Sequence, residues 1–133
     1  MKKAIIFICL CIGILFAGDF EVKGSMVYDE ETKLLWQKNP SNKKMTWSEA
    51  KDYCESLELR LPNLYELKSL VDYTKYNPAI RTNLINIKTD DWYWSASEYK
   101  GNSSGAWFVD FNYGNDNWDR KKSSYYVLCV SGQ

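Results

Sequence analysis

The sequence predicts an α+β fold: a mixed, mainly antiparallel sheet with two flanking helices, long loops and one disulfide. Three features carry this prediction. Short runs that alternate apolar and polar residues lie near both ends of the chain, as is typical of strands. Between them lie two helix-start signatures, each with a Glu three residues after a capping side chain. Two cysteines, Cys54 and Cys129, remain once an N-terminal leader is removed.

The leader consists of the cationic Met1–Lys3, an apolar run over Ala4–Phe16 and the small pair Ala17-Gly18. This order is typical of a secretory signal, and the apolar run is shorter than the roughly 20 residues that a membrane span needs. We expect a signal peptide over residues 1–18, cleaved near Ala17 or Gly18, and a single mature domain over residues 19–133. An uncleaved anchor is the alternative.

The mature chain is expected to open with a β-hairpin. Ser25–Asp29 and Leu34–Gln37 have the alternation of strands, and the turn residues of Asp29–Lys33 separate them. A polar loop, Asn39–Lys44, follows.

Two helices are expected next. Thr46 and Glu49 form the capping signature of the first, whose apolar face contains Trp47, Ala50, Cys54 and Leu57. Pro62 is expected to stop this helix, because proline cannot continue one. Asn63 and Glu66 repeat the signature for the second helix, whose apolar side contains Leu64, Leu67, Leu70 and Val71.

The second half of the chain is expected to return to strands. The elements are, in order, a loop with up to a turn of helix at Tyr73–Asp91, a strand at Tyr93–Ser97, a turn at Gly101–Gly105, a strand at Trp107–Phe111, a polar connection at Asn112–Ser124 and a closing apolar strand at Tyr125–Val130.

The cysteines indicate an oxidising compartment. Cys9 and Cys11 leave with the leader, and the two cysteines that stay, Cys54 and Cys129, are expected to pair. Closing so long a loop would contribute about 4 to 4.5 kcal/mol in the chain-entropy model. Two free thiols acting as a metal or redox pair are the alternative, although no CxxC motif or histidine accompanies them.

Composition excludes several classes of function. The chain contains no histidine, which removes hydrolases with an imidazole base and most catalytic zinc sites. Removing Lys2 and Lys3 leaves 15 of 17 basic residues against 17 acidic ones, a formal charge of −2, so no overall field attracts nucleic acid. The acids at Asp90-Asp91 and between Asp110 and Asp119 offer a catalytic carboxylate pair, but we interpret them as solvated charge.

Six fragments along the chain form a further pattern. They are Asp29 with Leu34-Leu35-Trp36, Trp47 with Ala50 and Tyr53-Cys54, Arg60–Leu67, Tyr93-Trp94-Ser95, Ala106–Phe111, and Val127–Val130. In this order they resemble the Lcl C-terminal domain family, long catalogued as a domain of unknown function and named for part of a bacterial collagen-like adhesin. The resemblance covers Tyr28–Val130.

The resemblance implies a fold related to C-type lectin-like and formylglycine-generating-enzyme-like domains, in which the chain ends pair in a sheet and two helices flank it. It also implies a disulfide between the first helix and the last strand, the same link that the cysteine count favours. The family often has Gly where Lys33 stands, so Lys33 is expected to take a positive φ or the turn to differ. A second departure is the short segment Leu57–Leu59 before Arg60, where the family often has a longer run.

Arg60 and Glu66 lie in the strongest motif, and we interpret them as structural. Glu66 can accept from backbone donors at the helix start, and Arg60 can pair with a carboxylate to lock the junction. The other motif residues interpreted as structural are Trp36, Trp47, Pro62, Asn63, Trp94 and Trp107.

The candidate ligand-binding surface lies in the segment Tyr113–Lys122. Amide and carboxylate side chains stand there beside an indole ring, a combination suited to sugar hydroxyls, and the adjacent basic cluster is suited to the sulfate or carboxylate groups of an anionic glycan. The candidate residues are Asn115, Asp116, Asn117, Trp118, Asp119, Arg120 and Lys121. The calcium motifs of sugar-binding C-type lectins, Glu-Pro-Asn or Gln-Pro-Asp, are absent, so neither calcium nor another cofactor is expected. A solvated strand connection is the alternative.

These observations predict an exported, non-catalytic binding or adhesion module, periplasmic or secreted, whose partner is a glycan or a cell-surface protein. We expect no nucleic-acid partner and no stable membrane insertion after cleavage of the leader. Two alternatives stay open. One is an enzyme related to formylglycine-generating oxidases, which would need a closely placed pair of free cysteines. The other is a structural subunit of a surface assembly.

Overall fold

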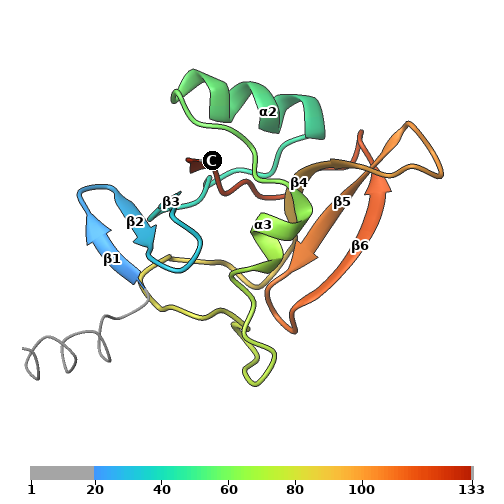
Figure 1. Cartoon of the computed structure of the whole chain (residues 1–133). Helices are drawn as coiled ribbons and strands as arrows, with labels where there is room; N and C mark the ends of the chain where they lie inside the picture. Colours follow the sequence, from blue (N-terminus) through green and yellow to red (C-terminus); the bar gives the residue numbers. More distant parts are fainter. Residues whose placement is uncertain (1–19, 133) are drawn as a thin grey trace, which may run out of the picture.

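A computed structural model describes residues 20–132, and the predicted signal peptide with its cleavage site lies outside them. Within these residues two antiparallel sheets accompany two helices (Figure 1). The first sheet has the order β1-β2-β3-β7, with strands Phe20–Lys23, Met26–Asp29, Leu34–Gln37 and Val130–Ser131. The second has the order β4-β5-β6, with strands Tyr93–Glu98, Gly105–Asp110 and Asn115–Arg120. The helices are α2, Trp47–Ser56, and α3, Leu64–Lys68.

The predicted α+β class, with two helices and antiparallel strand pairing, is confirmed. The strands form two sheets rather than one, because β4–β6 pair among themselves and not with β1–β3. In Figure 1 the first sheet lies on the left of the molecule and the second on the right, with α2 above and α3 in front of β4 and β5. The relation to C-type lectin-like domains stays a prediction.

The N-terminal hairpin is confirmed. In β2 and β3, Val27 pairs with Trp36 and both are fully buried. Lys33 in the turn has a φ of 65° and donates its N–H to the Asp29 carbonyl at 2.8 Å, so a lysine does occupy the conformation that usually favours glycine. β3 also pairs with β7, which joins the two ends of the chain as expected. β1 was not predicted, because it has only four residues and three of them are exposed, although Phe20 and Val22 alternate with Glu21 and Lys23.

Both helices begin where their capping signatures predict. The Thr46 hydroxyl accepts from the Glu49 N–H, and the Glu49 carboxylate accepts from the Thr46 N–H at 3.0 Å. The same reciprocal pair forms between Asn63 and Glu66, at 2.8 and 2.9 Å. The apolar side predicted for the second helix is buried, including the two residues beyond its end: Leu64, Leu67, Leu70 and Val71.

The predicted end of the first helix at Pro62 is wrong. α2 ends at Ser56, because the chain turns at Glu58, which has a φ of 60°. The Glu58 N–H donates to the Glu55 carbonyl and the Leu59 N–H to the Cys54 carbonyl, both at 2.9 Å, which is the Schellman closure of a helix. Leu57 therefore lies past the helix and is 46% exposed, so it does not belong to the apolar face.

The polar connection predicted at 112–124 is also wrong, since it contains β6. This strand pairs with β5 from Asn115 opposite Asp110 to Arg120 opposite Gly105, and it forms one edge of the second sheet. Asn and Asp are depleted in strands, but here their side chains accept hydrogen bonds from backbone N–H groups. The side-chain oxygen of Asn117 accepts from the Trp118 N–H at 2.8 Å, and that of Asp119 accepts from the Arg120 N–H at 2.7 Å. On an edge strand such bonds occupy donors that would otherwise pair with another strand.

The closing apolar segment is buried but is not one continuous strand. Only Val130–Ser131 belong to β7, while Tyr125 and Tyr126 form isolated bridges with Met45 and Tyr93. Its side chains alternate between two core clusters: Tyr126, Leu128 and Val130 join the first, and Tyr125, Val127 and Cys129 join the second. The segment is apolar throughout because both of its faces are buried.

The two clusters lie on either side of this segment. The first combines the N-terminal hairpin with α3, and the long loop Tyr73–Asp91 adds Ala79, Ile80 and Ile85 to it. The second packs α2 against β4 and β5. Because β4 and β5 contribute to both clusters, they hold α2 and α3 in fixed positions around the second sheet.

Candidate functional site

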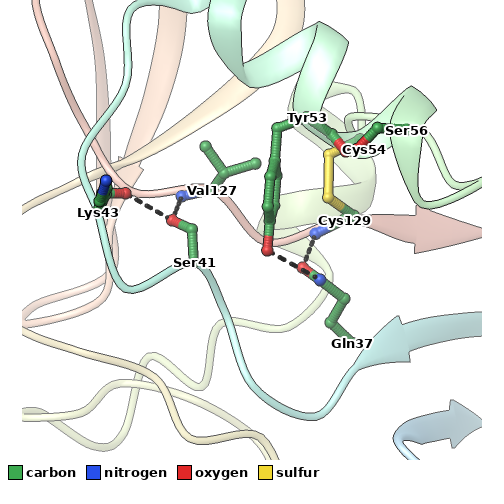
Figure 2. The surroundings of a disulfide bond; sticks show 8 residues. All are labelled: Gln37, Ser41, Lys43, Tyr53, Cys54, Ser56, Val127 and Cys129. Atoms are coloured by element: carbon green, nitrogen blue, oxygen red, sulfur yellow. Dashed lines mark hydrogen bonds between the residues drawn. A yellow bond between two sulfur atoms is a disulfide. The ribbon is translucent and has the colours of Figure 1, made fainter.

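Cys54 of α2 and Cys129 of the closing segment form the predicted disulfide. Their Cα atoms are 5.5 Å apart across a sequence separation of 75 residues. Gln37 at the end of β3 supports Cys129 (Figure 2): its N–H donates to the Cys129 carbonyl at 3.1 Å, and its side-chain oxygen accepts from the Cys129 N–H at 2.7 Å. Both cysteines are fully buried and bonded, so the alternative of two free thiols is wrong.

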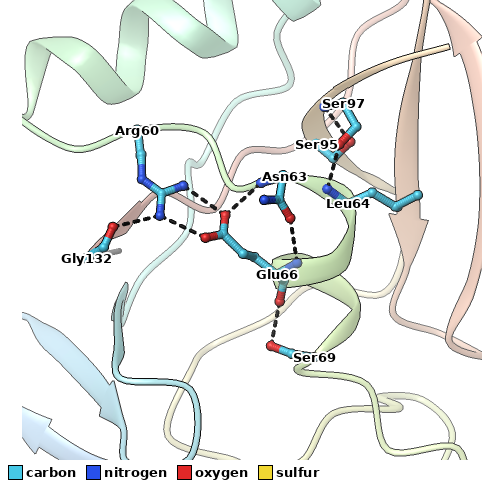
Figure 3. A network of polar contacts seen from close by, with 8 residues as sticks. All are labelled: Arg60, Asn63, Leu64, Glu66, Ser69, Ser95, Ser97 and Gly132. Carbon is cyan, nitrogen blue, oxygen red and sulfur yellow. Dashed lines mark hydrogen bonds and ion pairs between the residues drawn. The ribbon is translucent and has the colours of Figure 1, made fainter. Parts of the chain in front are cut away.

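Arg60 and Glu66 form a helix junction (Figure 3). The guanidinium donates to both carboxylate oxygens of Glu66 at 2.8 Å, and Nη2 also donates to the Gly132 carbonyl at 2.8 Å. Burial acts to raise the pKa of Glu66, but hydrogen bonds from Arg60 and the Asn63 N–H outweigh it and hold the pKa below its usual value. The junction thus ties the start of α3 to the C-terminal end of the chain.

The tryptophans of the motif differ in exposure. Trp36 and Trp94 are fully buried, and Trp47 is 9% exposed. The indole N–H of Trp47 donates to the Ser95 carbonyl at 2.8 Å, a bond between α2 and β4. Trp107 differs from them, since it is only half-buried and lines a groove on the surface.

The seven predicted ligand-binding residues do not share one face, because successive side chains of β6 alternate in direction. Asp116 pairs with Lys68 of α3 at 2.7 Å. Trp118 stacks on Tyr99, with ring centroids 4.3 Å apart and planes within 10°. These two predicted residues therefore lie on the side of the sheet that carries α3.

The remaining predicted residues have other surroundings. Asp119 accepts a hydrogen bond from the Tyr125 hydroxyl in the second core cluster. Lys121 pairs with Glu98 at 2.6 Å and lies over the Trp47 ring. The exposed ones are Asn115, Asn117 and Arg120. The strand therefore separates side chains that sequence reasoning had grouped, and their role in ligand binding stays a prediction.

The groove lies between α3 and the second sheet and has a volume of about 540 Å³. Its lining comes from α3 (Leu64, Tyr65, Lys68), from β4 and the turn after it (Ser97, Glu98, Tyr99, Lys100), and from Trp107 and Asp116. A second hollow of about 480 Å³ is lined by Lys68, Tyr73, Gly114, Asn115, Asp116 and Asn117. Sequence reasoning missed most of this lining, which comes from segments far apart in the chain.

Each of the two hollows contains a strongly exposed tyrosine ring. Tyr65 is 79% exposed and lines the groove, and Tyr73 is 68% exposed and lines the second hollow. Tyr76 and Tyr113 are also exposed and stack on each other, with ring centroids 6.3 Å apart. Large exposed aromatic rings are informative because they would otherwise be buried. The excess of tyrosine over phenylalanine, 10 against 5, was the signal for them in the sequence.

The charges of the groove compensate one another. The hydrogen bond to Asp116 raises the pKa of Lys68, and the hydrogen bond from Lys121 lowers the pKa of Glu98. Two cations, Lys68 and Lys100, and two carboxylates, Glu98 and Asp116, line the groove, and Lys68 is paired with Asp116 at 2.7 Å. The local field is therefore weak.

Fold and groove together define a small, disulfide-closed α+β domain with an open aromatic surface. Residues 25–131 match the model of the Lcl C-terminal domain, and the chain belongs to that family. The family points to a surface or adhesion-type module. No curated protein matches the chain.

Two further findings concern residues 20–132. None of the helices there has the length and apolar character to cross a membrane. Among the same residues, no three or more Cys, Asp or Glu side chains gather as a metal site would need. The disulfide fits an oxidising compartment outside the cytoplasm.

Proposed function

We propose that the chain is an exported, non-catalytic adhesion module, periplasmic or secreted, that binds neutral glycans in the groove between α3 and the second sheet. The observation that carries this proposal is the aromatic lining of the groove, in which Tyr65 is 79% exposed and Tyr99 and Trp107 lie nearby. A pyranose ring has an apolar C–H face that packs on aromatic rings, and hydroxyls that need hydrogen-bond partners.

The charges favour a neutral glycan over a sulfated one. The lining of the groove balances two cations, Lys68 and Lys100, with two carboxylates, Glu98 and Asp116, so a sulfate would meet no net positive charge there. A sugar hydroxyl can instead accept from Lys68 and donate to Asp116 without breaking the pair. Calcium is not expected to take part, because Asp116 and Asp119 are engaged with different partners.

The disulfide supports a binding module over an enzyme of the formylglycine-generating type. Such an enzyme relies on a closely placed pair of reactive cysteines, whereas Cys54 and Cys129 are bonded to each other and fully buried. A structural subunit of a surface assembly would not need an exposed aromatic groove.

A glycan array probed with the exported, processed protein, with and without calcium, tests the proposal. Binding to neutral glycans is expected to persist in chelator and to change little in high salt, since no net charge is neutralised. The Tyr65→Ala variant is expected to bind about tenfold more weakly. Arg120→Ala serves as the control, because Arg120 is exposed on β6 but lies outside both hollows.

Three results would contradict the proposal. The first is a failure to bind any glycan, and the second is unchanged binding by Tyr65→Ala. Binding confined to sulfated glycans and abolished by salt would show that charge, not the aromatic groove, recognises the ligand.

A further inference from the structure

The groove and the second hollow meet at one ion pair. Lys68 and Asp116 line both of them, and their charged atoms are 2.7 Å apart. The two side chains keep 33% and 26% of their surface exposed, so they stay accessible to a ligand. Each hollow alone has the size of a small-molecule site, which spans about 300–1,000 Å³.

The two hollows offer different chemistry. The groove presents aromatic and aliphatic surface from Tyr65, Tyr99 and Trp107. The second hollow presents the amides of Asn115 and Asn117 beside the Asp116 carboxylate. Each contains one strongly exposed tyrosine ring, Tyr65 in the groove and Tyr73 in the second hollow.

We propose that the two hollows are adjoining subsites of one binding trough, which takes an internal stretch of a linear, neutral oligosaccharide. This inference rests on the proposed glycan-binding function. One sugar unit stacks on the aromatic groove, the next lies over the Lys68–Asp116 pair, and a third donates and accepts hydrogen bonds with the amides of the second hollow. Both hollows are open to solvent, so the chain can continue past either end.

The ion pair explains why a linear chain fits better than a single terminal sugar. Lys68 offers donors and Asp116 offers acceptors at the junction, where a linkage oxygen and its neighbouring hydroxyl would lie. A single sugar can occupy only one hollow and leaves the other hydrated. An oligosaccharide that spans both hollows adds contacts without the cost of a second association event.

Isothermal titration with two homologous series tests the inference. The probes are β-1,4-linked glucose and β-1,4-linked N-acetylglucosamine oligomers, each from one to six units. For at least one series the affinity is expected to rise by about tenfold or more between one and three units and then to level off, as successive subsites are filled.

Three matched tyrosine variants separate the subsites. Tyr65→Ala is expected to weaken every length, by about tenfold, because it removes a stacking surface. Tyr73→Ala is expected to weaken only the longer oligomers, by a similar factor, and so to flatten the dependence on length. Tyr76→Ala is the control, since Tyr76 is 72% exposed but lies outside both hollows. All three rings are exposed, so equal melting temperatures are expected and would show that the fold is intact.

The inference and the proposed function fail in different ways. A monosaccharide that binds as tightly as the hexamer, or a Tyr73→Ala variant that matches the wild type at every length, overturns the two-subsite trough and leaves the glycan-binding groove standing. No binding by any oligomer in either series, together with an empty glycan array, overturns both.

Discussion

Arg81 on the long loop offers the most direct test of how that loop is held. Its Nη2 lies 2.6 Å from Asp29 at the end of β2, whose side chain is fully buried. Its Nε donates to the Ser69 carbonyl at 2.7 Å, just after α3. Its Nη1 also lies 3.0 Å from Glu31, whose side chain is 68% exposed. One guanidinium therefore makes a buried and an exposed ion pair side by side.

The perturbation is Arg81→Met, which keeps much of the apolar stem and removes the charge. It leaves the Asp29 carboxylate buried without a cation, a change that costs about 3–5 kcal/mol in proteins. Since small domains have total stabilities of about 5–15 kcal/mol, this is a large share of the whole. At roughly 4 °C for each kcal/mol, the melting temperature is expected to fall by about 12–20 °C.

Urea unfolding followed by the fluorescence of the six tryptophans measures this change. Glu31→Gln is the matched control, because it removes only the exposed partner of the same guanidinium and is expected to cost less than about 1 kcal/mol. If Arg81→Met costs no more than Glu31→Gln, the buried pair does not hold the loop and the reasoning is wrong.

Three further predictions concern the covalent link, the helix junction and the edge strand. Replacing Cys54 and Cys129 by Ala is expected to cost about 4.5 kcal/mol for a loop of 75 residues; a loss below about 1 kcal/mol in urea unfolding would contradict it. Glu66 has a lowered pKa in the fold, so its stabilisation is complete above about pH 5 and is lost as the pH falls through the lowered value. Wild-type stability should therefore fall more steeply below pH 5 than that of Glu66→Gln, and parallel pH profiles would refute this. Gly105→Ala places a Cβ 2.5 Å from the Trp118 ring and is expected to cost about 1–3 kcal/mol, so an unchanged unfolding midpoint would show that the ring is not packed there.

Features that depend on neighbouring residues could be predicted from the sequence. Both capping boxes, such as Asn63 with Glu66, join residues three positions apart, so the pattern alone determines the contact. The disulfide between Cys54 and Cys129 could be predicted because only one pairing is possible once the predicted leader is removed.

Features in which a residue occupies a position that usually takes another residue type could not be predicted from the sequence. α2 ends in a Schellman closure whose positive-φ position is Glu58, where glycine would have been the signal. β6 is built largely from Asn and Asp, which are depleted in strands, and it is stabilised by pairing with β5. In both cases the surrounding structure overrides the local preference.

The groove was only partly accessible to sequence reasoning. Because Leu64 and Leu67 point into the core, helical geometry alone places Tyr65 toward solvent and Lys68, one turn after Leu64, at the edge of the buried face. The position of Tyr73 depends on an irregular loop, and no periodicity relates it to α3. Only the fold brings these side chains to one surface.

The motif residues and the proposed ligand site are linked through α3. A helix of five residues is not stable alone, so this one needs its neighbours. The Arg60–Glu66 pair fixes its start, and Ser97 of β4 accepts from the Leu64 N–H at 2.9 Å. The same helix presents Tyr65 to the groove, where its ring is 79% exposed. The Arg60–Glu66 pair and the buried residues of α3 therefore act as positioning residues for the groove. The exposed residue, Tyr65, sets the chemistry of the groove, so a change there can alter ligand preference without loss of the fold.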